Sequence, residues 1–317
     1  MPTSPSFDTA VVFPGMGPAP FAEVARFMLV NRQARRLLAE ADEVLGYSVV
    51  DRYQEHGGVY SEYAQIAFLV NCLALLEWAE ETLDARPQVC AGPSFGSKAA
   101  AVRSGALAFA DAVRMTAELS HCEDAWFADH FSDVVTQSFV RVPEEGLAEL
   151  LAELDEQGEW HELSCHVDDD FWMLSLRERC LDRFRERVRA VGGMPLYTMR
   201  PPMHCRSFGG LRDLVEAEVI GRLEFRDPAL PIVADQDGAV LTTGEQVRTL
   251  MLDGYVRTVR WPGGVSTLKR LGVGRVCVAG PDGMFGRVPC TTRNFEVTAV
   301  DPRSAMLPRR RSPAPVV

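Results

Sequence analysis

A sharp turn, Gly92-Pro-Ser94-Phe-Gly96, between two periodic segments limits this chain to a small set of architectures. Residues 88–91 form a short apolar run, which predicts a buried strand, and residues 97–107 have helical periodicity. Glycines at both ends of the turn permit a tight backbone reversal, which lifts the Ser94 hydroxyl away from the sheet. A strand, a tight turn and a helix in this order are typical of α/β folds.

The same alternation of short apolar runs and helical segments continues along most of the chain. Thr9–Val12 is stopped by Pro14 and Gly15 and predicts a first buried strand. Later apolar runs predict strands at residues 232–234 and 275–279. Helical periodicity marks residues 21–45, 63–83, 109–125, 211–222 and 245–252. We therefore expect an α/β domain built from residues 8–129 and 204–300.

The pattern changes between residues 130 and 203. Alternating stretches at 138–142, 161–176 and 196–199 predict strands, and residues 144–156 and 178–191 predict helices. A β-α-β-α-β order in about 70 residues predicts a small inserted α+β subdomain. Residues 301–317 are expected to form a C-terminal tail, unpacked from Pro308 onward because three consecutive arginines occupy 309–311.

Composition excludes several classes of function. The 317 residues carry 44 acidic and 33 basic side chains, a net charge of −11, which disfavours nucleic acid and anionic membranes as partners. No apolar run approaches the roughly 18 residues that span a bilayer, and the N-terminus lacks the pattern of a secretory signal. The eight cysteines include no C-x-x-C pair, so we expect reduced thiols, no metal site and a cytoplasmic location.

Two side chains are candidates for catalysis. Ser94 has the position of a nucleophile on a G-x-S-x-G turn, and the helix that follows offers free N–H groups to a developing negative charge. Among six histidines, His204 stands out because Pro201 and Pro202 fix the backbone before it, between a predicted strand and a predicted helix. The alternative is that both are ordinary turn residues.

Five segments, in the same order, resemble the malonyl-CoA–acyl carrier protein transacylase family. They are Val12-Phe-Pro-Gly-Met-Gly17, Gly92–Gly96, Gly105-Ala-Leu-Ala-Phe-Ala-Asp-Ala-Val-Arg114, Pro202-Met-His204 and Thr258-Val-Arg-Trp261. The resemblance implies an α/β-hydrolase-like large domain with an inserted small ferredoxin-like α+β subdomain. This agrees with the change of pattern after residue 130.

The resemblance also implies a reaction and a set of site residues. Ser94 attacks a thioester, His204 accepts its proton, and the acyl group passes to the phosphopantetheine thiol of an acyl carrier protein. Backbone N–H groups of Met16 and Phe95 form the oxyanion hole, and the carbonyl near Gly254 orients His204. No cofactor is bound; the substrate arrives on phosphopantetheine or coenzyme A, and the enzyme is expected to be a monomer.

Departures from the family pattern bear on the substrate. Malonyl-specific members carry an arginine where this chain has Leu119, and a bidentate arginine pairs with the malonate carboxylate. Pro93 replaces the usual histidine of the elbow, and an aromatic segment around Trp126 is unusual, so Leu119, Pro93 and Trp126 are predicted to shape the acyl pocket. Compensation by Arg114 or another arginine stays open.

The favoured interpretation is a non-malonyl acyltransferase that resembles stand-alone polyketide-synthase acyltransferases, including those that move aminoacyl or dipeptidyl groups between carriers. An ammonium group on such a chain would meet one of several acidic side chains: Glu123, Asp124, Asp129 or the run Asp168–Asp170. Those acidic residues are alternatively a solvated surface.

Carrier binding is predicted at basic residues, because carrier proteins are acidic and this chain is acidic too. The candidates are Arg185, Arg189 and Arg206, with paired charges on a solvated helix as the alternative. Three other functions stay open: malonyl transfer, thioester hydrolysis by the same Ser94 and His204, and non-catalytic carrier binding. The presence of both Ser94 and His204 argues against the last.

Overall fold

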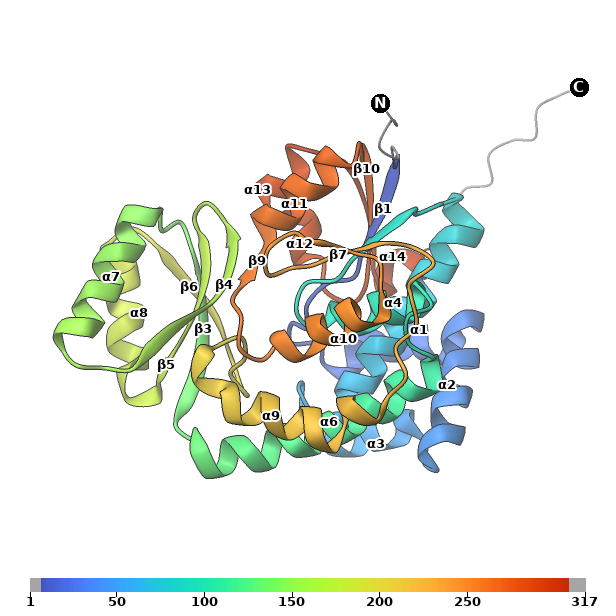
Figure 1. The fold of residues 1–317 in the computed structure, drawn as a ribbon, viewed down its shortest axis with the longest axis horizontal. Helices are drawn as coiled ribbons and strands as arrows, with labels where there is room; N and C mark the ends of the chain where they lie inside the picture. The colour runs from blue at the N-terminus through green and yellow to red at the C-terminus, as the bar shows by residue number, and fades with distance from the viewer. Residues whose placement is uncertain (1–6, 308–317) are drawn as a thin grey trace, which may run out of the picture.

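Short apolar strands build a first, mainly parallel sheet, as the sequence predicts. In this computed structural model, which describes residues 7–307, the sheet has the order β11-β10-β1-β2-β7-β8 (Figure 1). Its strands are β1 (Thr9–Val12), β2 (Val89–Ala91), β7 (Ile232–Val233), β8 (Val240–Leu241), β10 (Arg275–Ala279) and β11 (Glu296–Val300). All neighbours are parallel except β7 and β8. Every residue of β1 and β2 is buried, which is typical of a parallel sheet covered on both faces.

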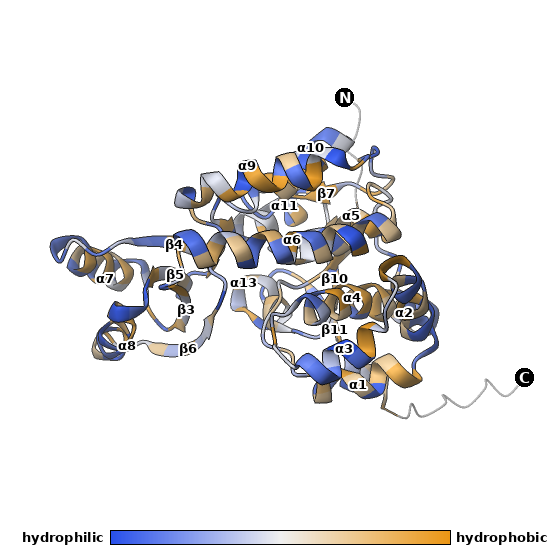
Figure 2. Cartoon of the chain, turned by 90° about the horizontal axis from the view of Figure 1, so that it is seen from below, coloured by the Kyte–Doolittle hydropathy of each residue, from blue (hydrophilic) through white to orange (hydrophobic). Residues whose placement is uncertain are grey.

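Helices surround this sheet. They are α1 (Phe21–Val30), α2 (Arg32–Leu45), α3 (Val49–His56), α4 (Glu62–Leu83), α5 (Gly96–Arg103), α6 (Phe109–His130), α9 (Gly209–Glu218), α10 (Gly244–Asp253), α11 (Trp261–Arg270), α12 (Met284–Arg287), α13 (Pro289–Thr292) and α14 (Pro302–Ala305), with 3₁₀ turns at Arg206–Phe208 and Ile220–Arg222. The α4 helix is buried along most of its length. By contrast, α6 alternates hydrophilic and hydrophobic residues along its exposed and buried faces (Figure 2).

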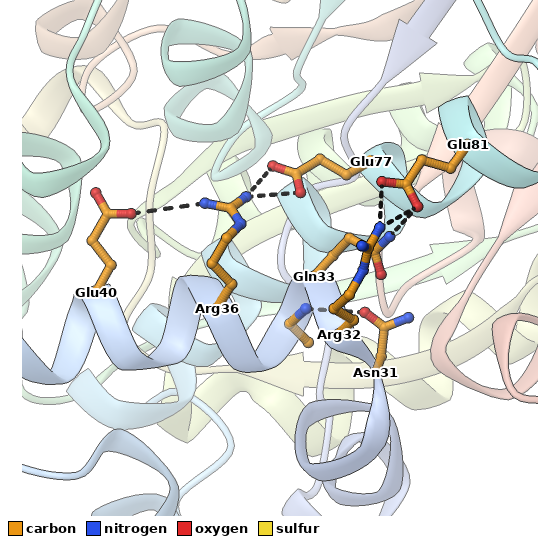
Figure 3. A network of polar contacts seen from close by, with 8 residues as sticks. Asn31, Arg32, Gln33, Arg36, Glu40, Glu77 and Glu81 are labelled. Carbon is orange, nitrogen blue, oxygen red and sulfur yellow. Dashed lines mark hydrogen bonds and ion pairs between the residues drawn. The ribbon is translucent and has the colours of Figure 1, made fainter.

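The segment 21–45 forms two helices, whereas its periodicity predicts one. Asn31 ends α1 and caps α2, because its side chain accepts a hydrogen bond from the Ala34 amide at 3.0 Å. Ion pairs then link α2 to α4, with Arg32 on Glu81 at 2.9 Å and Arg36 on Glu77 at 2.6 Å (Figure 3). These pairs are solvent-exposed, so each contributes at most about 1 kcal/mol, and the apolar contacts beneath them hold the helices together.

The second sheet has the order β6-β3-β5-β4-β9, and helices α7 and α8 cover one of its faces (Figure 1). Its elements are β3 (Val134–Val140), α7 (Glu144–Glu156), β4 (His161–Asp168), β5 (Phe171–Arg177), a 3₁₀ turn (Glu178–Cys180), α8 (Leu181–Ala190), β6 (Met194–Met199) and β9 (Val259–Arg260). The strands β3 to β6 pair antiparallel in ferredoxin-like order. The predicted fold class, a large α/β domain with a small ferredoxin-like subdomain, is confirmed.

Two details of this subdomain differ from the predicted pattern. The stretch 161–176, treated as one alternating segment, is a hairpin that turns at Asp169 and Asp170. The strand β9 lies outside the 130–203 segment and pairs parallel with β4, so the chain after the subdomain completes its sheet.

The C-terminal segment is partly packed. Helix α14 contacts α1 and α4, although residues 301–317 were expected to form a tail; the predicted unpacked stretch from Pro308 lies outside the described residues. All eight cysteines are free thiols. Within residues 7–307, no helix is both long and apolar enough to cross a bilayer, and no group of His, Cys, Asp and Glu side chains is arranged to hold a metal ion.

Candidate active site

Ser94 lies on a strained turn between β2 and α5. Its φ is +54°, in the left-handed region that a residue with a Cβ rarely adopts. Gly92 and Gly96 are required by close backbone approach: a Cβ on Gly92 would lie 2.2 Å from the Gly96 oxygen, and one on Gly96 would lie 2.1 Å from the Phe13 oxygen. The two glycines therefore let the turn pack against the end of β1 while Ser94 projects from it.

His204 lies next to Ser94. The Ser94 Oγ is 2.7 Å from His204 Nε2, although 110 residues separate them in the chain. The histidine also has a positive φ, +65°, and only 7% of its surface is exposed. Neighbouring hydrogen bonds fix its segment: the Ser164 hydroxyl donates to the Met203 carbonyl at 2.7 Å, and the Cys205 amide donates to the Tyr255 carbonyl at 3.1 Å.

Burial keeps the imidazole neutral. It lowers the pKa of His204 from 6.5 to about 4, and the Gly254 carbonyl partly opposes this shift. Nδ1 is buried and has no hydrogen bond of normal geometry among the described residues, but the Gly254 backbone lies close enough to the ring to favour its charged form. A neutral imidazole 2.7 Å from a hydroxyl can accept the proton of that hydroxyl.

The loop that carries Met16 lies against the serine turn. A Cβ on Gly15 would lie 3.4 Å from the Ser94 Cβ and 3.3 Å from the Pro93 oxygen. Met16 and Phe95 both line the cavity in front of Ser94, and neither amide donates to an acceptor within the described residues. Backbone N–H groups that have no other acceptor are the kind of donor that stabilises a developing oxyanion.

A cavity of about 160 Å³ opens in front of Ser94 and His204, between the two sheets. Leu119, which is predicted to shape the acyl pocket, lies on α6, is only 2% exposed and lines this cavity. Pro93 and Trp126 do not line it, contrary to the prediction. Pro93 is buried inside the turn, where its carbonyl accepts the Gly96 amide, and Trp126 stacks on His130 within an aromatic cluster that includes Phe208.

One wall of the cavity carries a buried lysine and a buried glutamate. Lys98 Nζ lies 4.3 Å above the Phe95 ring, and Glu123 Oε1 accepts a hydrogen bond from the Tyr255 hydroxyl at 2.8 Å. Burial lowers the pKa of Lys98 and raises the pKa of Glu123, and each charge partly offsets the shift of the other. The pair therefore leaves this wall close to electrically balanced.

Asp282 is a further polar residue on the cavity wall, and no sequence motif pointed to it. Its carboxylate forms no ion pair within residues 7–307, and burial raises its pKa. Tyr60 and Tyr197 lie close enough to Asp282 for its charge to raise their pKa values, and the buried Tyr60 hydroxyl has no hydrogen-bond partner among the described residues. Asp282 follows β10, at the carboxyl end of a parallel strand, where ligand sites of such sheets occur.

The other predicted acidic and basic candidates lie outside the cavity. Asp124 and Asp129 are exposed on α6. Asp168 ends β4, where it is buried and accepts the Cys290 amide at 2.9 Å, and Asp169 and Asp170 form the β4–β5 turn. Arg114 is exposed and paired with Asp111 at 2.9 Å, so it cannot compensate for Leu119. Among the described residues that line the cavity, none is an arginine.

The three arginines predicted to bind a carrier differ in environment. Arg185 is engaged by the second sheet, because it donates to Gln137 Oε1 at 2.9 Å and to Thr198 Oγ1 at 2.7 Å. Arg189 and Arg206 are exposed, and neither forms an ion pair within the part of the chain that is described. Arg185 is therefore a poor candidate for docking, and Arg189 and Arg206 remain available.

Several known proteins are similar to this chain in sequence. A sequence family described as the VinK acyltransferase small domain matches residues 138–199. The malonyl CoA-acyl carrier protein transacylase of Escherichia coli K12 is 23% identical over 280 residues, covering 86% of this chain and 88% of that protein. The Staphylococcus aureus MSSA476 protein of the same name is 23% identical, covering 92% of this chain and 95% of its own length.

Solved structures share the fold. A malonyl-transacylase in complex with the type II PKS acyl-carrier protein AntF superimposes with a TM-score of 0.80 at 23% identity, covering 94% of this chain and 98% of the other. FabD from Acinetobacter baumannii gives a TM-score of 0.80 at 19% identity, covering 95% and 96%. Over most of its length the chain is therefore similar in sequence to malonyl CoA-acyl carrier protein transacylases, which are acyltransferases, and it shares the fold of solved transacylases.

Proposed function

We propose that this protein transfers an acyl group from one carrier thioester to the phosphopantetheine thiol of an acyl carrier protein through an acyl-Ser94 intermediate. The observation that carries the proposal is the 2.7 Å contact between Ser94 Oγ and His204 Nε2 at the wall of a cavity. The sequence relationship to carrier-protein transacylases and the AntF complex of a structural neighbour support a carrier as partner.

The transfer has two balanced halves. In the first, His204 Nε2 takes the Ser94 proton as Oγ adds to the thioester carbonyl, and the amides of Met16 and Phe95 stabilise the oxyanion. Collapse forms the Ser94 ester, and the departing thiolate takes the proton from His204. In the second half, His204 deprotonates the acceptor thiol, which attacks the ester, and Ser94 regains its proton. No cofactor takes part beyond the phosphopantetheine arm.

Docking is proposed at Arg189 and Arg206, because a chain with a net charge of −11 needs local positive charge to attract an acidic carrier. We place the transfer in polyketide or macrolactam biosynthesis, in the cytoplasm. The match of residues 138–199 to the VinK acyltransferase small domain and the polyketide carrier of the AntF complex support that context.

Mass spectrometry of the protein after incubation with an acyl-loaded carrier tests the proposal. Transfer predicts an acyl adduct on the peptide containing Ser94, followed by acylation of an added acceptor carrier. Release of free acid without an acceptor would instead identify a thioester hydrolase. Absence of both adduct and turnover across a panel of acyl carriers would contradict both enzymatic functions.

The acyl group is proposed to be other than malonyl. Leu119 occupies the cavity wall where a malonate carboxylate would need a cation, and an unpaired buried carboxylate is costly. Malonyl transfer is the alternative, since the curated relatives are malonyl enzymes and Lys98 offers a cation in the same cavity. Lys98 is already balanced by Glu123, which is why we favour a non-malonyl substrate.

Leu119→Arg is expected to raise malonyl loading by about tenfold or more relative to an uncharged acyl group, because the guanidinium supplies a partner for the carboxylate. Leu119→Met, which preserves bulk without charge, is the control. The measurement is the rate of acyl-Ser94 formation from each donor by intact-protein mass spectrometry. Efficient malonyl loading by the unmutated enzyme would overturn the non-malonyl proposal.

The acyl chain is further proposed to carry an amine, as an aminoacyl or dipeptidyl group does. Asp282 is the supporting observation, because its carboxylate faces the cavity without an ion pair and Tyr60 and Tyr197 lie beside it. An ammonium group would satisfy both the charge and the free Tyr60 hydroxyl.

Asp282→Asn is expected to lower loading of an amine-bearing acyl group by about tenfold or more, while loading of the matched amine-free group changes little. Asp129→Asn removes an exposed carboxylate on α6 and serves as the control. Loading rates for the two donors measured on both variants give the selectivity. An equal loss for both donors would assign Asp282 a structural role instead.

A further inference from the structure

A second buried carboxylate, Asp235, contacts the nucleophile directly. It follows β7, beside β2 in the first sheet, and only 4% of its surface is exposed. Its Oδ2 accepts a hydrogen bond from the Ser94 amide at 2.6 Å. Its Oδ1 is buried without a hydrogen-bond partner among the described residues. The Ser94 amide is thus engaged by Asp235 and is not a donor for the oxyanion.

The backbone of Asp235 extends this contact to the second sheet. The Asp235 carbonyl accepts the Arg260 amide at 2.7 Å, and Arg260 belongs to β9. One residue therefore fixes the serine turn to β9, and β9 pairs with β4 of the subdomain. Because Ser94 is held at φ +54°, where a serine is strained, an external hydrogen bond to its amide stabilises that conformation.

Two charged side chains affect the pKa of Asp235. Asp237, on the same loop, raises the pKa of the Asp235 carboxyl, and Arg257 lowers it. The charge of Asp235 also raises the pKa of the Cys165 thiol on β4, and Ser94, whose amide Asp235 accepts, contacts His204 through its hydroxyl. Burial is the largest effect and raises the pKa of Asp235 to about 6, against the Ser94 amide, which favours the ionised form.

We propose that Asp235 is a positioning residue that holds Ser94 in its reactive conformation, and that the nucleophilicity of Ser94 depends on the ionisation of Asp235. An ionised carboxylate accepts the Ser94 amide strongly, whereas a protonated carboxyl accepts it less strongly and releases the strained turn. This rests on Ser94 being the nucleophile of the proposed function, but it concerns the serine itself and not the acyl donor.

The consequence is an acidic limb in the pH profile of Ser94 reactivity. Reactivity falls as the pH drops through about 6, where Asp235 takes up its proton. His204 would give a limb near pH 4 instead, because burial lowers its pKa to about 4. The position of the limb therefore distinguishes the carboxyl from the imidazole.

The experiment measures the labelling rate of Ser94 by a fluorophosphonate between about pH 4.5 and about pH 8.5. This probe reports serine nucleophilicity whatever the natural acyl group is. Asp235→Asn keeps a carbonyl acceptor and should lose the limb near pH 6 while labelling within about tenfold of the wild-type rate at high pH. Asp235→Ala removes the acceptor and should label about a hundredfold more slowly at every pH. Asp237→Asn removes a neighbouring charge that raises the pKa of Asp235, so it should keep an acidic limb and move that limb to lower pH.

Two results would overturn the proposal: a limb near pH 6 that persists in Asp235→Asn, or wild-type labelling by Asp235→Ala. If Asp235→Ala does not fold, the pH profile of Asp235→Asn still tests whether the limb near pH 6 belongs to Asp235. Failure of the folded wild-type protein to label at any pH, with Ser94→Ala as the blank, would instead count against Ser94 as nucleophile and hence against the proposed function.

Discussion

Ser94→Ala is expected to abolish acyl transfer, with a loss of about 10⁴-fold or more, while the fold is retained. Within residues 7–307, Ser94 supplies the one hydroxyl that hydrogen-bonds His204, with Oγ at 2.7 Å from Nε2. Alanine also carries a Cβ, so it meets the same strain at φ +54° as serine does, and the turn between β2 and α5 should keep its shape.

Two measurements check this expectation: acceptor-carrier acylation over time, and thermal unfolding to confirm the fold. Ser97→Ala is the matched control, since Ser97 also lines the cavity but its hydroxyl points to the Met251 sulfur at 3.5 Å. Ser97→Ala should retain most of the wild-type rate. Turnover by Ser94→Ala within about tenfold of wild type would exclude the acyl-serine mechanism.

The serine turn could be predicted from sequence because local chemistry alone specifies it. An apolar run, two glycines and a helical segment define the strand, the reversal and the helix within twenty residues, and the structure places Ser94 accordingly. His204 was harder, because its partner is 110 residues away; the prolines before it and the family resemblance singled it out from five other histidines.

Other features depend on contacts that no local pattern reports. Asp235 and Asp282 each follow a strand of the first sheet, and only the strand order brings them to Ser94 and to the cavity. Their position after a predicted strand was the one feature of the sequence that could have identified them as site residues. The prediction that Trp126 shapes the acyl pocket was wrong because it used only the position of Trp126 on its helix. Residues distant in the sequence, Phe208 among them, pack on Trp126 and bury it away from the cavity.

Two boundaries between secondary-structure elements were not predicted, because polar residues interrupt a periodic pattern only briefly there. Asn31 breaks 21–45 into α1 and α2 because its side chain caps the second helix, while the apolar periodicity on either side stays nearly continuous. The hairpin at Asp169 and Asp170 likewise interrupts an alternating run whose period resumes in β5. In both cases a side chain accepts a hydrogen bond from a nearby backbone amide where the pattern is interrupted: Asn31 from Ala34 and Asp168 from Asp169.

His204→Ala is expected to lower transfer by about 10³-fold or more, because a neutral serine hydroxyl is a poor nucleophile without a base at hydrogen-bond distance. The expected loss is smaller than for Ser94→Ala, since His204→Ala keeps the Ser94 hydroxyl as a nucleophile and loses only its base. The imidazole is buried and leaves a space next to Ser94, so added imidazole should restore part of the activity.

The backbone at His204 requires a second variant. Its φ of +65° is tolerated better by asparagine than by alanine, so His204→Asn separates loss of the base from strain in the segment Pro202–Cys205.

His130→Ala, which removes an exposed histidine stacked on Trp126, is the matched control and should transfer at close to the wild-type rate. The acylation rate of Ser94 in each variant, with and without imidazole, is the measurement. If His204→Asn folds and acylates within about tenfold of wild type, the proton of Ser94 goes to another base, and Asp235, whose carboxylate already holds the Ser94 amide, would be the group to examine for that role.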